Sequence, residues 1–204
     1  MASSTLGLDV GGTKIYCGLV SPRGKVQEEK KFPTQITKGT ARVIANIVAA
    51  IRSYRINSYD RIGIGITGHV RPDQGIVVRS ANLPAGWHNV PLRQRIAQIF
   101  KKPVSVDNDA NCVALAEALA GAGKKHNAVF SMTIGTGIGA GYVEHKKIFR
   151  GGNDAVEFGH IIIDQGRSLE NLVSGPMLSR QYYRRTGTRK NSPAIVAAAR
   201  AGNK

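Results

Sequence analysis

Turn-forming residues divide the first 32 residues into three short segments, of which the first two are apolar. Thr5–Val10 and Lys14–Val20 flank a double glycine, and a Ser-Pro-Arg-Gly turn at 21–24 separates the second segment from Val26–Phe32. Short apolar segments bounded by glycine and proline are typical of β-strands. The pattern therefore predicts three consecutive strands in an antiparallel meander.

Residues 40 to 120 switch between helical and strand periodicity. Thr40–Tyr54 carries apolar residues at helical spacing, and Arg61–Ile66 alternates isoleucine with glycine, as a buried strand can. The segments that follow are predicted to be a strand at Gly75–Ser80, a helix at Pro91–Phe100, a strand at Val104–Asp107 and a helix from Asn108 to about Ala120.

A strand that ends in a glycine turn occurs twice. Thr5–Val10 leads into Gly11-Gly12-Thr13, and a predicted strand at Ala128–Ile134 leads into Gly135-Thr136-Gly137, before a further strand at Gly141–Glu144. Neither turn is a Walker loop or a Rossmann fingerprint, because those motifs open a helix. The repetition predicts an α/β protein of the actin-like (ribonuclease H-like) class, with duplicated βββαβα halves around a central cleft.

Composition narrows the class of protein. Hydrophobic residues make up 42% of the 204 residues, which is enough to bury a core, and we expect halves at 1–115 and 116–204, the second one incomplete. The two cysteines have no CxxC spacing, which argues against a disulfide scaffold. Because the sequence has no apolar run of membrane length and no signal peptide, we expect a cytoplasmic protein without a membrane partner.

The chain is strongly basic. It contains 29 Lys and Arg against 13 Asp and Glu, for a formal net charge of +16, which raises the affinity for any polyanion. The basic residues are scattered along the chain, except that Pro176–Lys204 contains no acidic residue. The scatter favours an ordinary solvated surface over nucleic-acid binding.

The first glycine turn combines amides, a hydroxyl, a cation and a carboxylate, the groups that suit a magnesium-bound phosphate. They are contributed by Gly11 and Gly12, Thr13, Lys14 and Asp9. The alternative is a tight hairpin that needs its glycines only for a positive φ. The second glycine turn favours phosphate binding, since both turns would face one cleft.

Asn108 and Asp109 lie at a predicted strand-to-helix junction. Catalytic carboxylates often stand above the end of a parallel sheet, and phosphoryl transfer to an alcohol needs a base within reach of the hydroxyl. The alternative role is helix capping, worth about 1 kcal/mol. Both can hold, because one residue can cap the helix while its neighbour reaches into the cleft.

A second polar group surrounds the later glycine-rich loop. Glu157, His160 and Glu170 suit a polyhydroxylated ligand, although the spacing alone favours ordinary surface polarity. His160 has no cysteine or histidine close by in the sequence, so zinc is not expected. In the loop 82–87, Asn82 is a better ligand candidate than Trp87, because a lone tryptophan more often belongs to a core or an interface.

These segments resemble the ROK family, which contains repressors and sugar kinases such as bacterial glucokinase. The matching blocks occur in the family's order across nearly the whole chain. They are LGLDVGGTKI (6–15), ANLPAGW (81–87), VDNDAN (106–111), TIGTGIGAG (133–141), EFGH (157–160) and LENLVSG (169–175).

The resemblance implies an ATP-dependent hexose kinase that uses Mg²⁺, with Asp109 as the general base on the sugar 6-hydroxyl. The sugar hydroxyls would be held by Asn82, Asn108, Asp109, Glu157, His160 and Glu170. The ATP phosphates would lie between Asp9, Gly11, Gly12, Thr13 and Lys14 on one side and Gly135, Thr136 and Gly137 on the other. Many relatives are dimers, so a homodimer is one expectation.

Three departures from the family pattern shape the prediction. The usual zinc-binding stretch after EFGH is replaced by the short, cysteine-free IIIDQGRSLENL, so bound zinc is not expected. Only a few residues precede Leu6, which disfavours a DNA-binding repressor of the family's usual layout. The chain also stops where family members continue towards the adenosine site, so we expect a member truncated at its C-terminus.

The leading hypothesis is phosphorylation of a hexose, glucose by default, at the 6-hydroxyl. The alternative is a non-catalytic sugar-binding or regulatory member of the family without a DNA-binding domain. ATP binding separates the two, because a sugar sensor need not bind ATP. Nucleic-acid binding through the basic tail is a third, weaker hypothesis, which a steep salt dependence of affinity would reveal.

Overall fold

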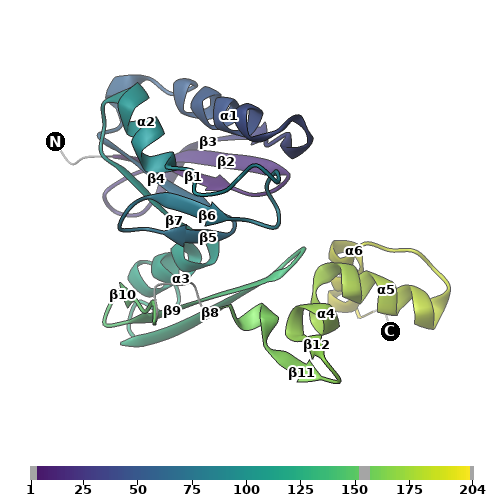
Figure 1. The fold of residues 1–204 in the computed structure, drawn as a ribbon. Coiled ribbons are helices and arrows are strands. Elements are labelled where there is room, and N and C mark those ends of the chain that lie inside the picture. The colour runs from purple at the N-terminus through teal and green to yellow at the C-terminus, as the bar shows by residue number, and fades with distance from the viewer. Residues whose placement is uncertain (1–3, 152–156, 203–204) are drawn as a thin grey trace.

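The structure, a computed structural model, describes residues 4–151 and 157–202. Its largest sheet has five strands in the order β3-β2-β1-β4-β7 (Figure 1). The bounds are β1 Thr5–Val10, β2 Lys14–Val20, β3 Val26–Pro33, β4 Arg61–Ile66 and β7 Val104–Asn108. Strands β1, β4 and β7 are parallel, whereas β2 is antiparallel to both β1 and β3. The predicted meander of three strands is confirmed.

Helices cover both faces of this sheet (Figure 1). The helices α1 (Thr40–Arg52) and α2 (Leu92–Phe100) pack on one face, and α3 (Asp109–Leu119) packs on the other. The main core lies under α1 and α2 and includes Trp87, which is only 1% exposed. Trp87 therefore belongs to the core, and it is not available to stack on a sugar.

Short elements connect the main ones. The 3-10 helices η1 (Ile36–Lys38) and η2 (Ile56–Ser58) flank α1, and a hairpin of β5 (His69–Arg71) and β6 (Ile76–Arg79) follows β4. The predicted strand Gly75–Ser80 corresponds to β6, whereas the three-residue β5 was not predicted.

A second sheet follows α3. It contains β8 (Ala128–Ile134), β9 (Ile138–Glu144) and β10 (Lys147–Ile148) in the order β10-β9-β8. Helix α3 lies between the two sheets and packs closely on β9, since a Cβ at Gly141 would lie 2.6 Å from the Cβ of Ala114. The predicted boundary at residue 115 falls inside α3, and the division into halves stays a prediction.

The last part of the chain forms a cluster at one end of the second sheet (Figure 1). It comprises η3 Phe158–His160, β11 Ile162–Asp164, β12 Arg167–Ser168, α4 Leu169–Val173, α5 Gly175–Thr186 and α6 Ser192–Arg200. Ser168 caps α4 and Asn191 caps α6 through their side-chain oxygens. Gly187, at a φ of 69°, ends α5 in the left-handed conformation that glycine adopts without strain.

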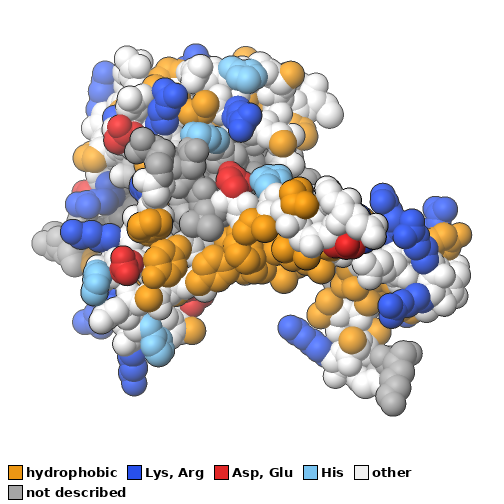
Figure 2. Space-filling view, turned by 60° about the horizontal axis from the view of Figure 1, so that its bottom comes forward, with side chains coloured by type: hydrophobic (Ala, Val, Ile, Leu, Met, Phe, Trp, Pro, Cys, Tyr) orange, Lys and Arg blue, Asp and Glu red, His pale blue; other side chains and the backbone are white. Residues whose placement is uncertain are grey.

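The outer face of β8 is apolar and exposed. Phe130, Met132 and Ile134 alternate along it, and Figure 2 shows hydrophobic side chains gathered in a band over this side of the molecule. Among the described helices, none is both long enough and apolar enough to cross a membrane.

Candidate active site

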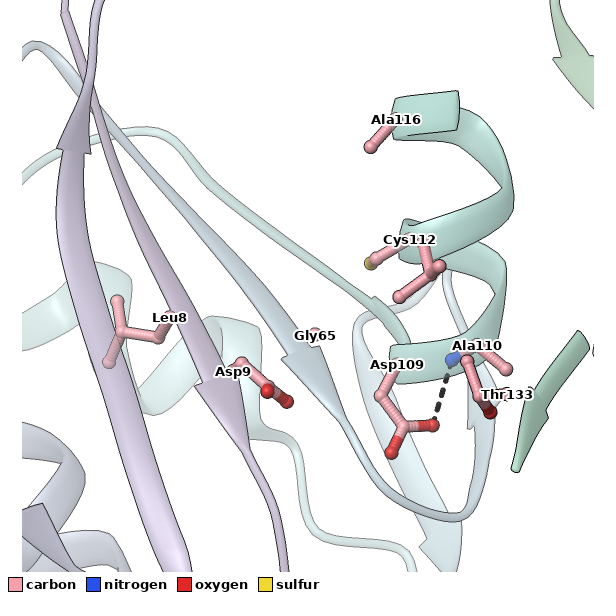
Figure 3. Close-up of a pocket in the computed structure, with 9 residues that line it drawn as sticks. Leu8, Asp9, Gly65, Asp109, Ala110, Cys112, Ala116 and Thr133 are labelled. Atoms are coloured by element: carbon pink, nitrogen blue, oxygen red, sulfur yellow. Dashed lines mark hydrogen bonds between the residues drawn. The ribbon is translucent and has the colours of Figure 1, made fainter. Parts of the chain in front are cut away.

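Two carboxylates share a pocket of about 410 Å³ at the edge of the large sheet (Figure 3). Asp9 comes from the end of β1 and Asp109 from the first turn of α3, and both point into the same space on either side of Gly65. The lining residues are Leu8, Asp9, Gly65, Asp109, Ala110, Cys112, Val113, Ala116 and Thr133. From the sequence, Asp9 was assigned to the phosphate and magnesium site and Asp109 to the base, and both assignments stay predictions.

The register of the parallel strands explains why the carboxylates meet. Asp9 pairs with Gly65, and Gly65 pairs with Asp107, so the carboxyl ends of β1, β4 and β7 form one edge. A Cβ at Gly65 would lie 3.3 Å from the Cys112 Sγ and 3.6 Å from the Asp109 Cα. The missing side chain at Gly65 therefore keeps the space between the two carboxylates open.

The pocket favours the protonated forms of its acidic groups. Burial raises the pKa of Asp109, although the Ala110 amide, which donates to its Oδ1 at 2.9 Å, opposes the shift. The pKa of Asp9 is raised by partial burial and then by the negative charge of Asp109. Burial, together with the nearby carboxylates, raises the pKa of Cys112 to about 12, so that thiol stays protonated at neutral pH.

Asn108 is the N-cap of α3, which is the helix-capping role that the sequence analysis gave as the alternative to a catalytic role. Its Oδ1 accepts from the Asn111 amide at 3.1 Å, and its Nδ2 donates to the Gly68 carbonyl at 3.0 Å. Asn108 therefore joins α3 to the loop after β4, while Asp109 reaches into the pocket. Its assignment as a sugar ligand stays a prediction.

The first glycine turn, Gly11 to Lys14, is tight for a reason other than positive φ. Neither Gly11 nor Gly12 has a positive φ, so the hairpin alternative raised from the sequence does not explain them. Gly12 is required instead by close approach, because a Cβ there would lie 2.8 Å from the Asn82 carbonyl oxygen. The turn and the loop that carries Asn82 are therefore in direct contact.

Buried Thr34 supports this turn from behind. Its hydroxyl donates to the Gly11 carbonyl at 2.7 Å, and its amide donates to the Thr13 carbonyl at 3.0 Å. Within the described residues, the amides of Gly12 and Thr13 donate no hydrogen bond. These amides, with the exposed side chains of Thr13 and Lys14, are available to an anion.

The second glycine turn is held by the C-terminal cluster. The Gly135 amide donates to the Gly137 carbonyl at 2.9 Å, and the Gly175 amide at the start of α5 donates to the Gly135 carbonyl at 2.8 Å. Glu170 accepts from the Ile138 amide at 2.8 Å, and a Cβ at Gly137 would lie 2.5 Å from its Oε2. Glu170 thus orders the turn in this structure, and its role as a sugar ligand stays a prediction.

Three further predicted ligands lie outside the pocket lining. Glu157 and His160 are 57% and 68% exposed and lie 3.6 Å apart at η3, between the His160 Nε2 and the Glu157 Oε2. Asn82 is exposed, and its Nδ2 donates to the Thr67 hydroxyl at 3.4 Å. Their assignments as sugar ligands stay predictions.

Sequence reasoning missed several residues that build the site. Thr34 gave no signal, because its role depends on a contact with a turn 23 positions away. Asp107 belongs to the same VDNDAN block as Asp109, and its forked contact with Arg150 appears only in the structure. Gly65 was seen only as part of an alternating strand.

Comparison with known proteins finds relatives that are named as glucokinases. The chain is 34% identical to a glucokinase of Thermotoga maritima over 195 residues. This alignment covers 95% of this chain and 57% of that protein. The chain spans about half the length of other curated glucokinases that it matches.

Solved structures share the fold. A ROK family glucokinase from Streptomyces griseus, in complex with glucose and AMPPNP, matches 98% of this chain and 72% of its own with a TM-score of 0.84 and 31% identity. A ROK family transcriptional regulator, a homologue of the E. coli MLC protein, matches 89% of this chain and 49% of its own with a TM-score of 0.76 and 26% identity. The expected actin-like fold is confirmed by the ROK sugar kinases among these neighbours. The ROK family model matches residues 5–204, and the chain belongs to the ROK family.

Proposed function

We propose that the protein transfers the γ-phosphoryl group of ATP to the 6-hydroxyl of a hexose, with glucose as the default substrate. The observation that carries the proposal is the Asp109 carboxylate, which points into a pocket beside Asp9. Similarity to a glucokinase seen with glucose and AMPPNP supports both the sugar and the nucleotide.

Asp109 would accept the proton of the sugar hydroxyl as that oxygen attacks the γ-phosphorus. A general base must lie within hydrogen-bond reach of the proton, and its catalysis is most efficient when its pKa is close to the working pH. Burial raises the pKa of Asp109, which makes the carboxylate a stronger base than an exposed aspartate. The Ala110 amide fixes one carboxylate oxygen and leaves the other directed into the pocket.

The two glycine turns would position the phosphates. The amides of Gly12 and Thr13 and the cation of Lys14 offer donors on one side, and Gly135–Gly137 forms the second turn. Holding donor and acceptor in line accounts for much of the rate of phosphoryl transfer, which requires little covalent chemistry from the protein.

The residues present fit a hydrated magnesium ion. Mg²⁺ is typically held by one or two carboxylates, with water and substrate phosphates completing its shell. Asp9 supplies a carboxylate near the end of β1, two residues before Gly11 of the first glycine turn. Bound there with the nucleotide, Mg²⁺ would neutralise phosphate charge.

The test is phosphoryl transfer from Mg-ATP to a panel of hexoses, with the phosphorylated position read by NMR of the product. We expect one preferred hexose and a 6-phosphate. Asp60→Asn is a matched control for Asp109→Asn, because exposed Asp60 directly precedes β4, at the opposite end of that strand from the pocket. Turnover retained by Asp109→Asn, or lost equally in Asp60→Asn, would refute the assignment of the base.

The similarity to a transcriptional regulator of the same family supports a second candidate, a sugar-binding regulator. Calorimetric titration with Mg-ATP, with and without glucose, separates the two candidates. A kinase binds both ligands, whereas glucose binding without any nucleotide binding would favour the regulator.

A further inference from the structure

Arg150 follows β10 and reaches back to the end of β7. Its Nη1 donates to the Asp107 Oδ1 at 3.1 Å, and its second terminal nitrogen donates to the other carboxylate oxygen. The two residues are 43 positions apart, and their side chains are only 30% and 17% exposed. A forked and partly buried pair of this kind fixes geometry more strongly than an exposed ion pair does.

Asp107 is also the centre of the turn that opens α3. The same Oδ1 accepts from the Asn108 amide at 2.7 Å and from the Asn111 Nδ2 at 3.4 Å. In the described part of the chain, the Asn111 Oδ1 is buried without a partner, so this side chain is held only through its nitrogen. The orientation of the first turn of α3 therefore depends on where the Asp107 carboxylate is held.

Arg150 sets that position from the second sheet. Without its guanidinium, the Asp107 carboxylate would be partly buried and uncompensated, two residues before Asp109. An unpaired buried charge is costly, and the turn would shift to expose the carboxylate to water. Asp109 would move with the turn, because it is the first residue of α3.

We propose that Arg150 is a positioning residue, which clamps Asp107 and thereby fixes Asp109 against the second sheet for phosphoryl transfer. The proposal rests on the function proposed above. In this proposal, the contact between the two sheets keeps the Asp109 carboxylate in line with the bound substrates. This alignment matters because misplacement by about 1 Å can cost roughly 100-fold in rate.

The decisive variant is Arg150→Gln, with Arg167→Gln as its matched control. Arg167 makes an exposed ion pair with Asp164, in which the two side chains are 54% and 47% exposed, and Arg167 is not among the residues that line the pocket. We expect Arg150→Gln to lower kcat roughly 10- to 100-fold while KM for ATP changes less than about threefold. Arg167→Gln should retain wild-type kcat.

Two further variants separate positioning from simple stabilisation. Arg150→Lys should restore kcat only in part, because one ammonium group cannot reproduce the fork. Asp107→Asn combined with Arg150→Gln should cost no more in kcat than the worse single variant, as expected for two residues of one unit. Wild-type kcat in Arg150→Gln would overturn the proposal, and so would additive losses in the double variant.

Hydrogen exchange gives a readout that does not need turnover. Arg150→Gln should speed exchange of the amides in the first turn of α3, and Arg167→Gln should not. If the wild-type chain phosphorylates no sugar, the proposed function fails. Hydrogen exchange alone then tests whether Arg150 positions the first turn of α3. Equal exchange at α3 in both variants would overturn the positioning role.

Discussion

Gly12→Ala tests whether the contact between the phosphate turn and the Asn82 loop matters. The added Cβ would lie 2.8 Å from the Asn82 carbonyl oxygen, a backbone atom, which is closer than real Cβ atoms approach, and 3.3 Å from the Asn82 Cβ. The φ of Gly12 is not positive, so the backbone conformation itself tolerates alanine. Steric contact with the loop is therefore the only perturbation that the structure identifies.

The size of the effect follows from that contact. To reach an ordinary separation, the turn or the loop must move by roughly 0.5 Å or more, and overpacking of this kind typically costs about 1–3 kcal/mol. Because the turn would hold phosphates and the loop a sugar, we expect a loss of kcat/KM of roughly 10- to 100-fold as well.

Gly11→Ala is the matched control, because its Cβ would meet only the Lys14 carbonyl oxygen, at an ordinary 3.5 Å. The assay is thermal unfolding of both variants, followed by initial rates with varied ATP and hexose. Equal stability and equal rates in the two variants would refute the reasoning, because they differ chiefly in the contact with Asn82.

Two further predictions concern the first turn of α3. Asp109→Asn should be more stable than the wild type at neutral pH. The pKa of Asp109 in the folded protein is raised above its ordinary value of 3.8, so the unfolded chain loses the carboxyl proton at a lower pH than the folded chain does. The stability of the wild type therefore falls as the pH rises from about 3.8 to the pKa of the folded state. Asparagine cannot ionise, so urea unfolding at several acidic pH values should show a weaker fall, and an unchanged slope would contradict the shift. Asn108→Ala should cost about 1–2 kcal/mol of unfolding free energy through the lost cap. Asn57→Ala in exposed η2 should cost far less, and equal losses in urea unfolding would contradict the capping role.

Local sequence patterns were sufficient to predict the elements whose structure depends mainly on their own residues. Thr5–Val10 and Arg61–Ile66 form strands with the predicted bounds, because their alternation and the flanking turns specify them. The helices α5 and α6 were not predicted, because basic and polar residues give α5 little apolar periodicity and α6 is a short, alanine-rich segment. Strand β5 has three residues, which is too few to show an alternation of apolar and polar positions.

The candidate site was predictable in its residue types and only partly in its contacts. Asp109 was expected in the cleft because catalytic carboxylates often stand above the end of a parallel sheet, and Asp9 was expected beside the first glycine turn. The close approach that requires Gly12, and the clamp between Asp107 and Arg150, join residues far apart in sequence. Such contacts depend on how the sheets pack, which no local pattern encodes.

The measurement that tests the central claim most directly is a comparison of glucose binding and turnover in the wild type and Asp109→Asn. The account predicts that the dissociation constant for glucose changes less than about threefold, while kcat with Mg-ATP falls roughly 100- to 10,000-fold, the usual contribution of a general base. If Asp109→Asn phosphorylated glucose as fast as the wild type, Asp109 would not be the base and the account would be wrong.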